Sequence, residues 1–368
     1  MNELTIHPNV YATGHSKGLL QLLERAWVRG HTPGDGLLFI VSGFGNYNGG
    51  VRFYDTFRRH IDSGGRVVAV FGGSTSQRLT SRQVVAELLA AGVEVHVINR
   101  KRILHAKSYG AVRDSGEILI VSSGNFTGPG MSQNIEMALL LNEETTASLN
   151  YSGRAMLDSL LGQSWDYYRP SLEAPAAPAW QLLYDERGGE AMLDETLAVS
   201  MILRLSHADT ARIMADPGTN AGKGSQYFWL SKDSFDFVPP LTIVNRRGYK
   251  ATYACEIVLN FVDLGRTETV RVTFEAENNL DFRMGTGPLR YSKLAREGDL
   301  AAITRLGEDR YELRLFPQDS DRYQRLLPYA VTFVGHQGKR YGFIPNDEFE
   351  RETGIQLGRA DRQALRLN

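Results

Sequence analysis

The chain has 368 residues, of which 42% are hydrophobic and 23% charged, as in an ordinary globular protein. Its length predicts two domains. The formal net charge is −1, and dividing the chain near residue 190 leaves neither half basic. Bulk charge therefore does not favour nucleic acid as a partner, and any DNA-binding face must come from local clustering of cations.

The same data exclude several other classes of protein. The first residues, MNELTIHPNV, lack a basic segment followed by an apolar run, so we expect no signal peptide. No apolar run approaches the roughly 18 residues that cross a bilayer, so we expect no membrane partner. Cys255 is the only cysteine, which excludes internal disulfides and cysteine-rich zinc sites and fits a reducing, cytoplasmic location.

The first part of the chain alternates strand-like and helix-like segments. Apolar, β-branched runs that end in Gly, Ser or Asn predict buried strands at 36–44, 66–73, 93–99 and 117–125. Between them, apolar residues at helical spacing that stop at glycine predict helices at 50–65 and 81–92. This alternation predicts an α/β domain whose mixed, mostly parallel sheet is covered by helices.

A segment rich in proline and alanine separates two regions of the chain with different hydrophobic patterns. YRPSLEAPAAPAW (168–180) follows neither the helical nor the strand period and is the best linker candidate. Beyond it, short strand-like runs such as 252–264 are broken by turn signals, which predicts a mainly-β barrel or sandwich. We place a first domain at 1–170, a linker at 171–192 and a second domain at 193–368.

The stretch ILHAKSYG places His105 two residues before Lys107. A histidine imidazole is a good nucleophile toward phosphorus because its ordinary pKa of about 6.5 leaves it largely neutral at physiological pH. Residues two apart on a strand share a face, so Lys107 can bind the oxygens of a phosphate that His105 attacks. The motif alone is a weak signal, since a histidine flanked by small and apolar residues is usually a core residue.

Three further residues strengthen the interpretation. Ser123 lies 18 residues after His105, and Asn125 is expected on the same strand face, so both offer neutral donors to the phosphate. Glu136 follows 11 residues after Asn125 and can hold the imidazole in one tautomer, as a carboxylate does in other histidine-based sites. No carboxylate cluster of metal-site type accompanies the motif, so we expect neither a metal ion nor a small-molecule cofactor.

These residues resemble the signature of the phospholipase D superfamily, H-x-K followed by G-S-x-N and a later acidic residue. Residues 105–107, 123–125 and Glu136 supply its main parts. Two positions depart from it, since Val112 stands where an aspartate is usual and Ser122 replaces the first glycine. The missing aspartate is common in nuclease-type members, so the resemblance favours a nucleic-acid substrate over a lipid.

Longer stretches resemble one branch of that superfamily, the BfiI-like metal-independent type IIS restriction endonucleases. They span nearly the whole chain and include HPNVYATG, SGFGNYNGGVRFYDTF, GGSTSQRL, SSGNFTGPGMSQNIE, QYFWLSKDSFDF and VTFEAENN. The resemblance implies a phospholipase-D-like nuclease domain followed by a B3-like pseudobarrel that reads double-stranded DNA. It also implies cleavage at a fixed distance outside an asymmetric site, which is ACTGGG in close relatives.

The superfamily chemistry needs two histidines at one phosphate, one to attack and one to protonate the leaving oxygen. A second H-x-K occurs at His15 and Lys17, but Ser42 lies 27 residues after His15 and Asn46 four residues further, so the spacing does not match. If His105 is the only catalytic histidine, two chains must face each other across a twofold axis. The expected enzyme is a homodimer, paired through the catalytic domain, with one composite active site.

If the second domain reads DNA, base contacts come from Arg, Lys, Asn and Gln on exposed loops and strand edges. Resemblance to B3-like readers makes 207–229 and 336–342 two arms around the major groove. The candidate contacts are Arg212, Asn220, Lys223, Gln226, Trp229, Arg246, Arg247, Lys250, Asn279, Arg283, Lys339 and Arg340. The alternative for each is a solvated surface position, and for Trp229 a core position.

Two other functions fit part of the pattern. A phospholipase or phosphatidyl transferase uses the same histidine on a lipid phosphodiester, but the sequence has no amphipathic basic helix for a membrane surface. A DNA-binding protein with an inert nuclease site is the second alternative, and the intact set of His105 and its companions argues against it. We therefore expect a sequence-specific, metal-independent endodeoxyribonuclease that acts through a phosphohistidine.

Overall fold

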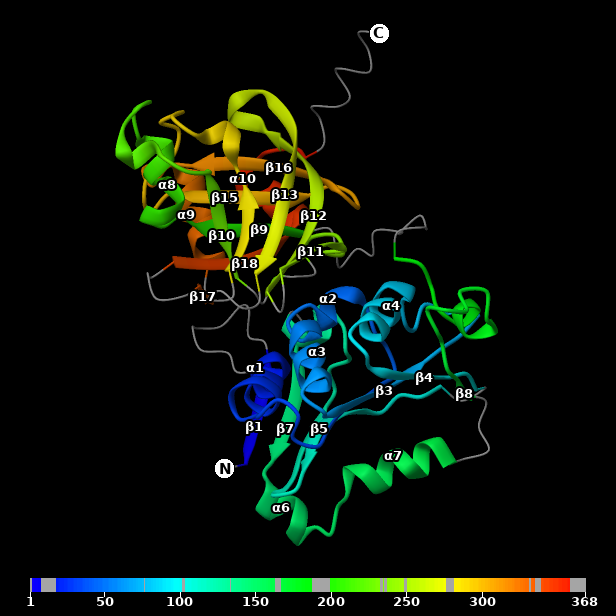
Figure 1. The fold of residues 1–368 in the computed structure, drawn as a ribbon. Helices are drawn as coiled ribbons and strands as arrows, with labels where there is room; N and C mark the ends of the chain where they lie inside the picture. The colour runs from blue at the N-terminus through cyan, green and yellow to red at the C-terminus, as the bar shows by residue number, and fades with distance from the viewer. Residues whose placement is uncertain are drawn as a thin grey trace. The chain divides into compact units, whose positions relative to one another are not determined.

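The computed structural model of the protein describes residues 2–7, 18–75, 77–100, 103–132, 134–162, 167–186, 199–231, 234, 237–247, 250–275, 281–330, 332–334 and 339–357. The His15–Lys17 motif, Asn279 and the side chains of Arg247 and Lys250 lie outside the described residues. The chain divides into two compact units (Figure 1). The first holds the described residues up to 186 and those of 244–253, and the second holds those of 199–243 and 254–357.

The first unit is a mixed sheet with helices packed against it, in the strand order β1-β7-β6-β5-β2-β3-β4-β8. Its elements are β1 (Glu3–His7), α1 (Leu19–Glu24), η1 (Arg25–Arg29), β2 (Leu37–Ser42), α2 (Tyr47–Gly50), α3 (Tyr54–Asp62), β3 (Arg66–Gly72), α4 (Arg82–Ala90), β4 (Glu94–Ile98), β5 (Lys107–Arg113), β6 (Gly116–Ser122), α5 (Gly128–Ser132), β7 (Glu136–Leu141), α6 (Glu143–Ser148), α7 (Gly153–Gly162), β8 (Tyr167–Tyr168) and η2 (Pro178–Leu182). The predicted mixed α/β architecture is confirmed. Its parallel part is smaller than expected, because only β2–β3 and β3–β4 are parallel among the described strand pairs.

Both faces of this sheet carry core side chains because the central strands are apolar on both sides. Every residue of β2 is buried. On one face, Phe39 of β2 packs in a cluster with Leu157 of α7. On the other, Trp27 of η1 meets Phe53 edge-on with 5.1 Å between ring centroids, and its indole N–H donates to the Gly110 carbonyl oxygen over 3.0 Å. The sheet is therefore the rigid support of whatever lies at its strand ends.

The described part of the expected linker, 171–186, packs on the first unit through main-chain hydrogen bonds. The Ser74 N–H donates to the Leu182 carbonyl oxygen over 2.9 Å. Tyr184 donates its N–H to Thr80 over 3.1 Å, and its carbonyl oxygen accepts from Arg82 over 2.8 Å. The described part of the expected linker thus belongs to the first unit, and the domain boundaries drawn from the sequence stay a prediction.

The second unit is a strand-rich sheet in the order β10-β14-β13-β12-β16-β15-β9-β18-β17, and β11 pairs with β12. Most of β11 and the start of β12 (244–253) are counted with the first unit, although both strands lie in this sheet. The elements from β9 onward are β9 (Val199–Arg204), α8 (His207–Met214), η4 (Asn220–Gly222), β10 (Tyr227–Leu230), β11 (Ile243–Arg247), β12 (Lys250–Phe261), η6 (Val262–Leu264), β13 (Arg266–Glu275), β14 (Asp281–Gly285), η7 (Gly287–Leu289), β15 (Leu300–Arg305), β16 (Arg310–Phe316), α9 (Asp321–Leu326), η8 (Leu327–Tyr329), β17 (Thr332–Val334), β18 (Lys339–Pro345) and α10 (Asn346–Thr353). One part of its core joins Ile202, Phe316 and Phe349. The predicted mainly-β second domain is confirmed.

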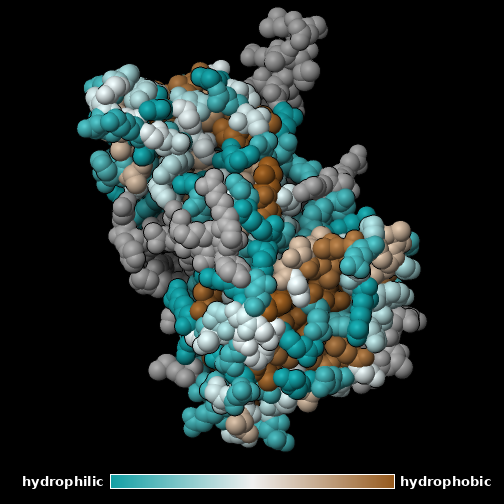
Figure 2. Space-filling model, in the orientation of Figure 1, coloured by the Kyte–Doolittle hydropathy of each residue, from teal (hydrophilic) through white to brown (hydrophobic). Residues whose placement is uncertain are grey.

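Both units expose apolar residues among hydrophilic ones on the face drawn in Figure 2, and the brown apolar patches of the first unit are the larger. Within the described part of the chain, no helix combines the length and the apolar composition needed to span a membrane.

Candidate active site and nucleic-acid interface

His105 and Lys107 lie where β5 begins, at the edge of the sheet where the parallel strand β2 ends. Lys107 pairs in antiparallel register with Ser42, the last residue of β2. Gly43 follows, and a Cβ atom at that position would lie 2.4 Å from the Leu104 carbonyl oxygen. Only glycine therefore permits this close approach of the two segments, which holds the His105 segment against the end of the sheet.

The Lys107 ammonium lies against the His105 imidazole. Its Nζ is 3.0 Å from Nδ1 and 3.1 Å from Nε2 of His105, and it donates to the His105 carbonyl oxygen over 2.9 Å. Because an ammonium can only donate, a ring nitrogen that accepts from it uses its lone pair in that bond, and the lone pair is free for attack only when Lys107 turns to another acceptor such as a phosphate oxygen. Burial lowers the pKa of Lys107, and the nearby charge of Glu136 opposes that effect. Phe44 stands edge-on to the imidazole, with 6.2 Å between ring centroids.

Ser123 and Glu136 meet where β6 has ended and β7 begins. The Ser123 hydroxyl donates to the Glu136 carboxylate and accepts from the Met137 N–H over 3.0 Å. The Asn134 side-chain amide donates to the other carboxylate oxygen of Glu136 over 3.1 Å. We expected Glu136 to bind the His105 imidazole. Among the described residues of this chain, however, its carboxylate is bound by Ser123 and Asn134.

Asn125 lies in the irregular segment that follows β6 and not on a strand. β6 ends at Ser122, and the Gly124 N–H folds back to the Ser122 hydroxyl over 2.9 Å. The expectation that Ser123 and Asn125 share a strand face is therefore wrong. Asn125 instead lies beside the end of β2, where its Oδ1 is 3.4 Å from the Ser42 hydroxyl. This segment brings Asn125 to the same edge of the sheet as Lys107.

Sequence reasoning missed three residues of this site: Ser42, Phe44 and Asn134. Ser42 ends an apolar strand and Phe44 follows two residues later, and in α/β sheets ligands bind beyond the carboxyl ends of parallel strands. That rule could have pointed to both. Asn134 precedes Glu136 by two residues, and this spacing alone does not predict a contact between their side chains.

This arrangement can bind and attack a phosphodiester. Lys107 and Asn125 offer donors to the anionic oxygens, and His105 offers a ring nitrogen for nucleophilic attack or proton transfer. Across the residues that the structure describes, no group of three or more His, Cys, Asp or Glu side chains is placed to hold a metal ion.

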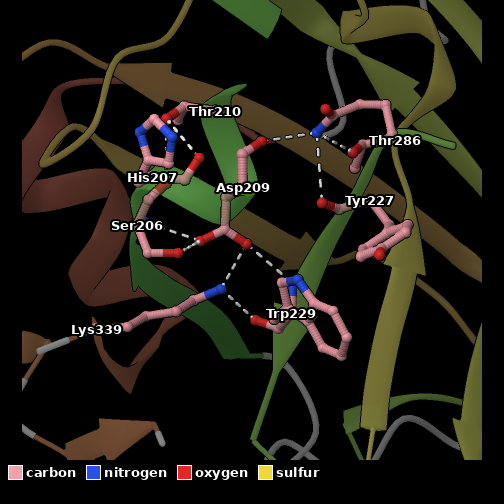
Figure 3. A network of polar contacts seen from close by, with 9 residues as sticks. Ser206, His207, Asp209, Thr210, Tyr227, Trp229, Thr286 and Lys339 are labelled. Carbon is pink, nitrogen blue, oxygen red and sulfur yellow. Dashed lines mark hydrogen bonds and ion pairs between the residues drawn. The ribbon is translucent and has the colours of Figure 1, made fainter. Parts of the chain in front are cut away.

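In the second unit, two of the candidate DNA contacts, Gln226 and Lys339, are buried, and Figure 3 shows Lys339 beside Asp209 and Trp229. Lys339 Nζ donates to Asp209 Oδ1 over 2.6 Å and also to the Trp229 carbonyl oxygen. Gln226 Nε2 donates to the Asp209 carbonyl oxygen over 2.8 Å. The expectation that Lys339 and Gln226 point toward bases is thus corrected, because an ammonium or an amide is buried only where partners replace water.

Asp209 is the centre of this polar network. Its carboxylate is fully buried and accepts from the Ser206 N–H over 2.8 Å, the Ser206 hydroxyl over 2.6 Å and the Trp229 N–H over 2.9 Å. Ser206 and Asp209 form the capping box at the start of α8, and this sequence pattern predicts a helix start at His207. Burial lowers the pKa of Lys339, and Asp209 opposes that shift. The network ties α8, β10 and β18 together.

Three other candidates surround an aromatic residue that the sequence did not single out, Tyr227 of β10. The guanidinium of Arg212 lies 5.7 Å from the centre of its ring, and that of Arg283 lies 5.3 Å away. Trp229 meets the ring edge-on at 5.0 Å and pairs in register with Arg283 of β14. The structure thus brings Arg212, Trp229 and Arg283 together.

The remaining described candidates are exposed. Asn220 begins η4, Lys223 follows it, and Arg340 is the second residue of β18. Arg246 belongs to the first unit, where its guanidinium forms an ion pair with Glu87 of α4.

Two family profiles match the chain. Residues 193–356 match the family described as "Metal-independent restriction enzyme BfiI DNA binding domain", and residues 47–152 match "Cardiolipin synthase, PLD-like domain". The chain joins a phospholipase-D-like domain to a BfiI-type DNA-binding domain. The phospholipase-D-like match includes His105 to Glu136, and the BfiI-type match includes Asp209, Tyr227 and Lys339. This combination of domains supports a nuclease of the restriction type.

Solved structures are similar to the chain at low sequence identity. The phospholipase D family member Nuc from Salmonella typhimurium is 15% identical, covers 46% of this chain and 99% of its own, and has a TM-score of 0.32. NucT from Helicobacter pylori is 15% identical, covers 44% of this chain and 96% of its own, and has a TM-score of 0.32. Polyphosphate kinase from Porphyromonas gingivalis is 11% identical, covers 89% of this chain and 49% of its own, and has a TM-score of 0.33. A search of curated proteins gives no match.

Proposed function

We propose that the chain is a sequence-specific type IIS restriction endonuclease that hydrolyses DNA phosphodiester bonds without a metal ion. The observation that carries this proposal is the contact between the Lys107 ammonium and the His105 ring nitrogens, 3.0 and 3.1 Å apart. It leaves a nucleophile and an anion-binding cation side by side, in a chain that also has a BfiI-type DNA-binding domain. We further propose that the protein acts in the cytoplasm.

The proposed reaction has two displacements at phosphorus. A ring nitrogen of His105 bonds to phosphorus while the bond from phosphorus to one deoxyribose oxygen breaks, and the His105 of a second chain gives its proton to that oxygen. Water then attacks phosphorus, gives a proton to the second histidine and releases the first. Lys107 and Asn125 stabilise the anionic oxygens in both steps. Glu136 is bound by Ser123 and Asn134, and we propose that it acts on the histidine of the second chain.

An exposed apolar surface beside the site supports the proposed homodimer. Leu4 of β1 and Val121 of β6 both pair in register with Leu139 of β7, and their side chains are 64% and 47% exposed. Met137, two residues from Leu139, is 53% exposed, and Ile135 beside Glu136 is 74% exposed. Contiguous exposed apolar residues commonly mark an interface. A second copy covering this strip would bring its own active site next to the first.

Cleavage of plasmid DNA in excess EDTA tests the proposal. We expect discrete fragments from the wild type and none from His105→Ala, with Arg154→Ala, which alters an exposed residue of α7, as the control. Cleavage that requires a divalent metal, or that survives in His105→Ala, would refute it. A heterodimer purified from wild-type and His105→Ala chains with different tags should be inactive, and half-activity would refute the shared site.

The description of the matched family, cardiolipin synthase, favours a second candidate function, transfer at a lipid phosphodiester. The same protein is therefore assayed with vesicles of phosphatidylglycerol. Release of a lipid product that depends on His105, together with no cleavage of DNA, would establish the lipid function instead.

A further inference from the structure

Two arginines of the BfiI-type domain lie against the aromatic ring of Tyr227. Arg212 comes from α8 and Arg283 from β14, so the two cations reach the ring from separate elements. Both guanidinium groups lie within the roughly 6 Å at which a cation and an aromatic face attract each other. Two like charges held around one ring form a prepared site for the acceptor atoms of a partner.

The polar network around β10 fixes the backbone of the strand that carries Tyr227 (Figure 3). Phe228 and Leu230 are buried, so Tyr227 and Trp229, which alternate with them, project from the other face of the strand. Gln226 donates to the Tyr227 carbonyl oxygen over 3.3 Å, and the Trp229 N–H is bound by Asp209. The strand therefore cannot rotate without breaking buried hydrogen bonds.

Each arginine has a second contact that restricts its guanidinium. Arg283 forms an ion pair with Glu275 of the neighbouring strand β13. The Arg212 Nε donates to the Lys223 carbonyl oxygen over 2.7 Å. Arginine has five N–H donors in a planar fork, so these contacts and the ring set the plane of each fork while other donors are left to bind a ligand.

We propose that Tyr227 is a positioning residue that sets the sequence specificity of DNA binding by orienting Arg212 and Arg283. This inference rests on the proposed function. Bidentate recognition of a guanine edge requires a guanidinium of fixed plane, whereas attraction to a phosphate needs mainly the charge. Loss of the ring should therefore reduce the preference for the cognate sequence more than it reduces binding to DNA in general.

The experiment uses the full chain carrying His105→Ala, so that DNA is bound without being cut. A duplex is first selected from a random-sequence library with this parent protein. Its dissociation constant and that of a scrambled duplex of equal composition are then measured by fluorescence anisotropy at one salt concentration. Tyr227→Leu should lower the ratio of the two affinities about tenfold, the size of a partial loss of one bidentate contact. Tyr227→Phe, which keeps the ring, should stay within about twofold of the parent.

Two further variants separate positioning from a general structural effect. Tyr329→Leu, which alters another half-buried tyrosine of the second unit, should leave the ratio unchanged. In a parent that also carries Arg212→Gln and Arg283→Gln, Tyr227→Leu should have no further effect on the ratio, because Tyr227 acts through the two arginines.

The outcomes distinguish the inference from the function on which it rests. If the parent selects no common sequence, the proposed function and the inference both fail. If the parent has a preference that Tyr227→Leu retains, only the inference fails. Equal weakening of both duplexes, loss of preference in Tyr227→Phe, or a further loss in the arginine-deficient parent would also overturn the inference.

Discussion

Replacing Lys339 by methionine should destabilise the BfiI-type domain, although the sequence presents this lysine as a surface contact. Its ammonium is buried and bound to the Asp209 carboxylate, which is fully buried too. Methionine keeps much of the side-chain volume but removes the charge and both hydrogen bonds. The carboxylate of Asp209 is then left buried without its countercharge.

Breaking one partner of a buried ion pair costs about 3–5 kcal/mol of the free energy of unfolding. Asp209 keeps its hydrogen bonds from Ser206 and Trp229, so we expect the lower end, about 3 kcal/mol. The exposed Lys223 provides the matched control, and Lys223→Met should change stability by less than about 0.5 kcal/mol.

Hydrogen exchange of the full chain, read by mass spectrometry, measures this effect segment by segment. Peptides covering 207–230 should lose protection in Lys339→Met, whereas peptides covering 66–98 of the first unit should not change. Unchanged protection in 207–230 would show that Lys339 behaves as a surface lysine, and would refute the reasoning from burial.

Three other perturbations have defined expected results. Burial, and then the charge of His60, lowers the pKa of His31 to about 4, and burial lowers that of His60. Only the unfolded chain binds these protons between about pH 6.5 and pH 4, so the first unit should lose stability as the pH falls through this range. The melting temperature of His31→Leu should depend less on pH than that of the wild type, and an equal dependence would contradict this prediction. Gly43→Ala should reduce cleavage more than tenfold, because the added Cβ would displace the segment that carries His105. The control is Gly162→Ala, whose added Cβ would meet no atom within 4 Å and which should cleave as the wild type does. Glu136→Gln should lower the cleavage rate about 100-fold with normal DNA binding, and a normal rate in a plasmid assay would remove Glu136 from the mechanism.

The sequence predicted the two fold classes because the hydrophobic period changes along the chain. Apolar runs such as Leu37–Ser42 bury every residue, and helices such as Arg82–Ala90 begin at a capping serine and end near glycine. The H-x-K motif predicted that His105 and Lys107 lie close together, because two residues that close in sequence stay close in any extended segment, although His105 itself precedes the start of β5 at Lys107. Local chemistry was therefore readable from local sequence.

Contacts between distant residues required the tertiary structure. Nothing in the sequence says that β6 ends at Ser122, that Asn125 turns toward Ser42 of β2, or that Asn134 and Ser123 hold Glu136. Sheet register decides these contacts, and register is a property of the packed strands.

The sequence by itself determined the chemistry available to this protein: a histidine and a lysine two residues apart, and arginines in a strand-rich second domain. Only the tertiary structure decided which charged groups face water. Lys339 and Arg340 are adjacent in sequence, yet one is buried on Asp209 and the other exposed. A strand alternates its side chains between two faces, and the partner elements packed on each face determine which residue has its charge neutralised inside the protein.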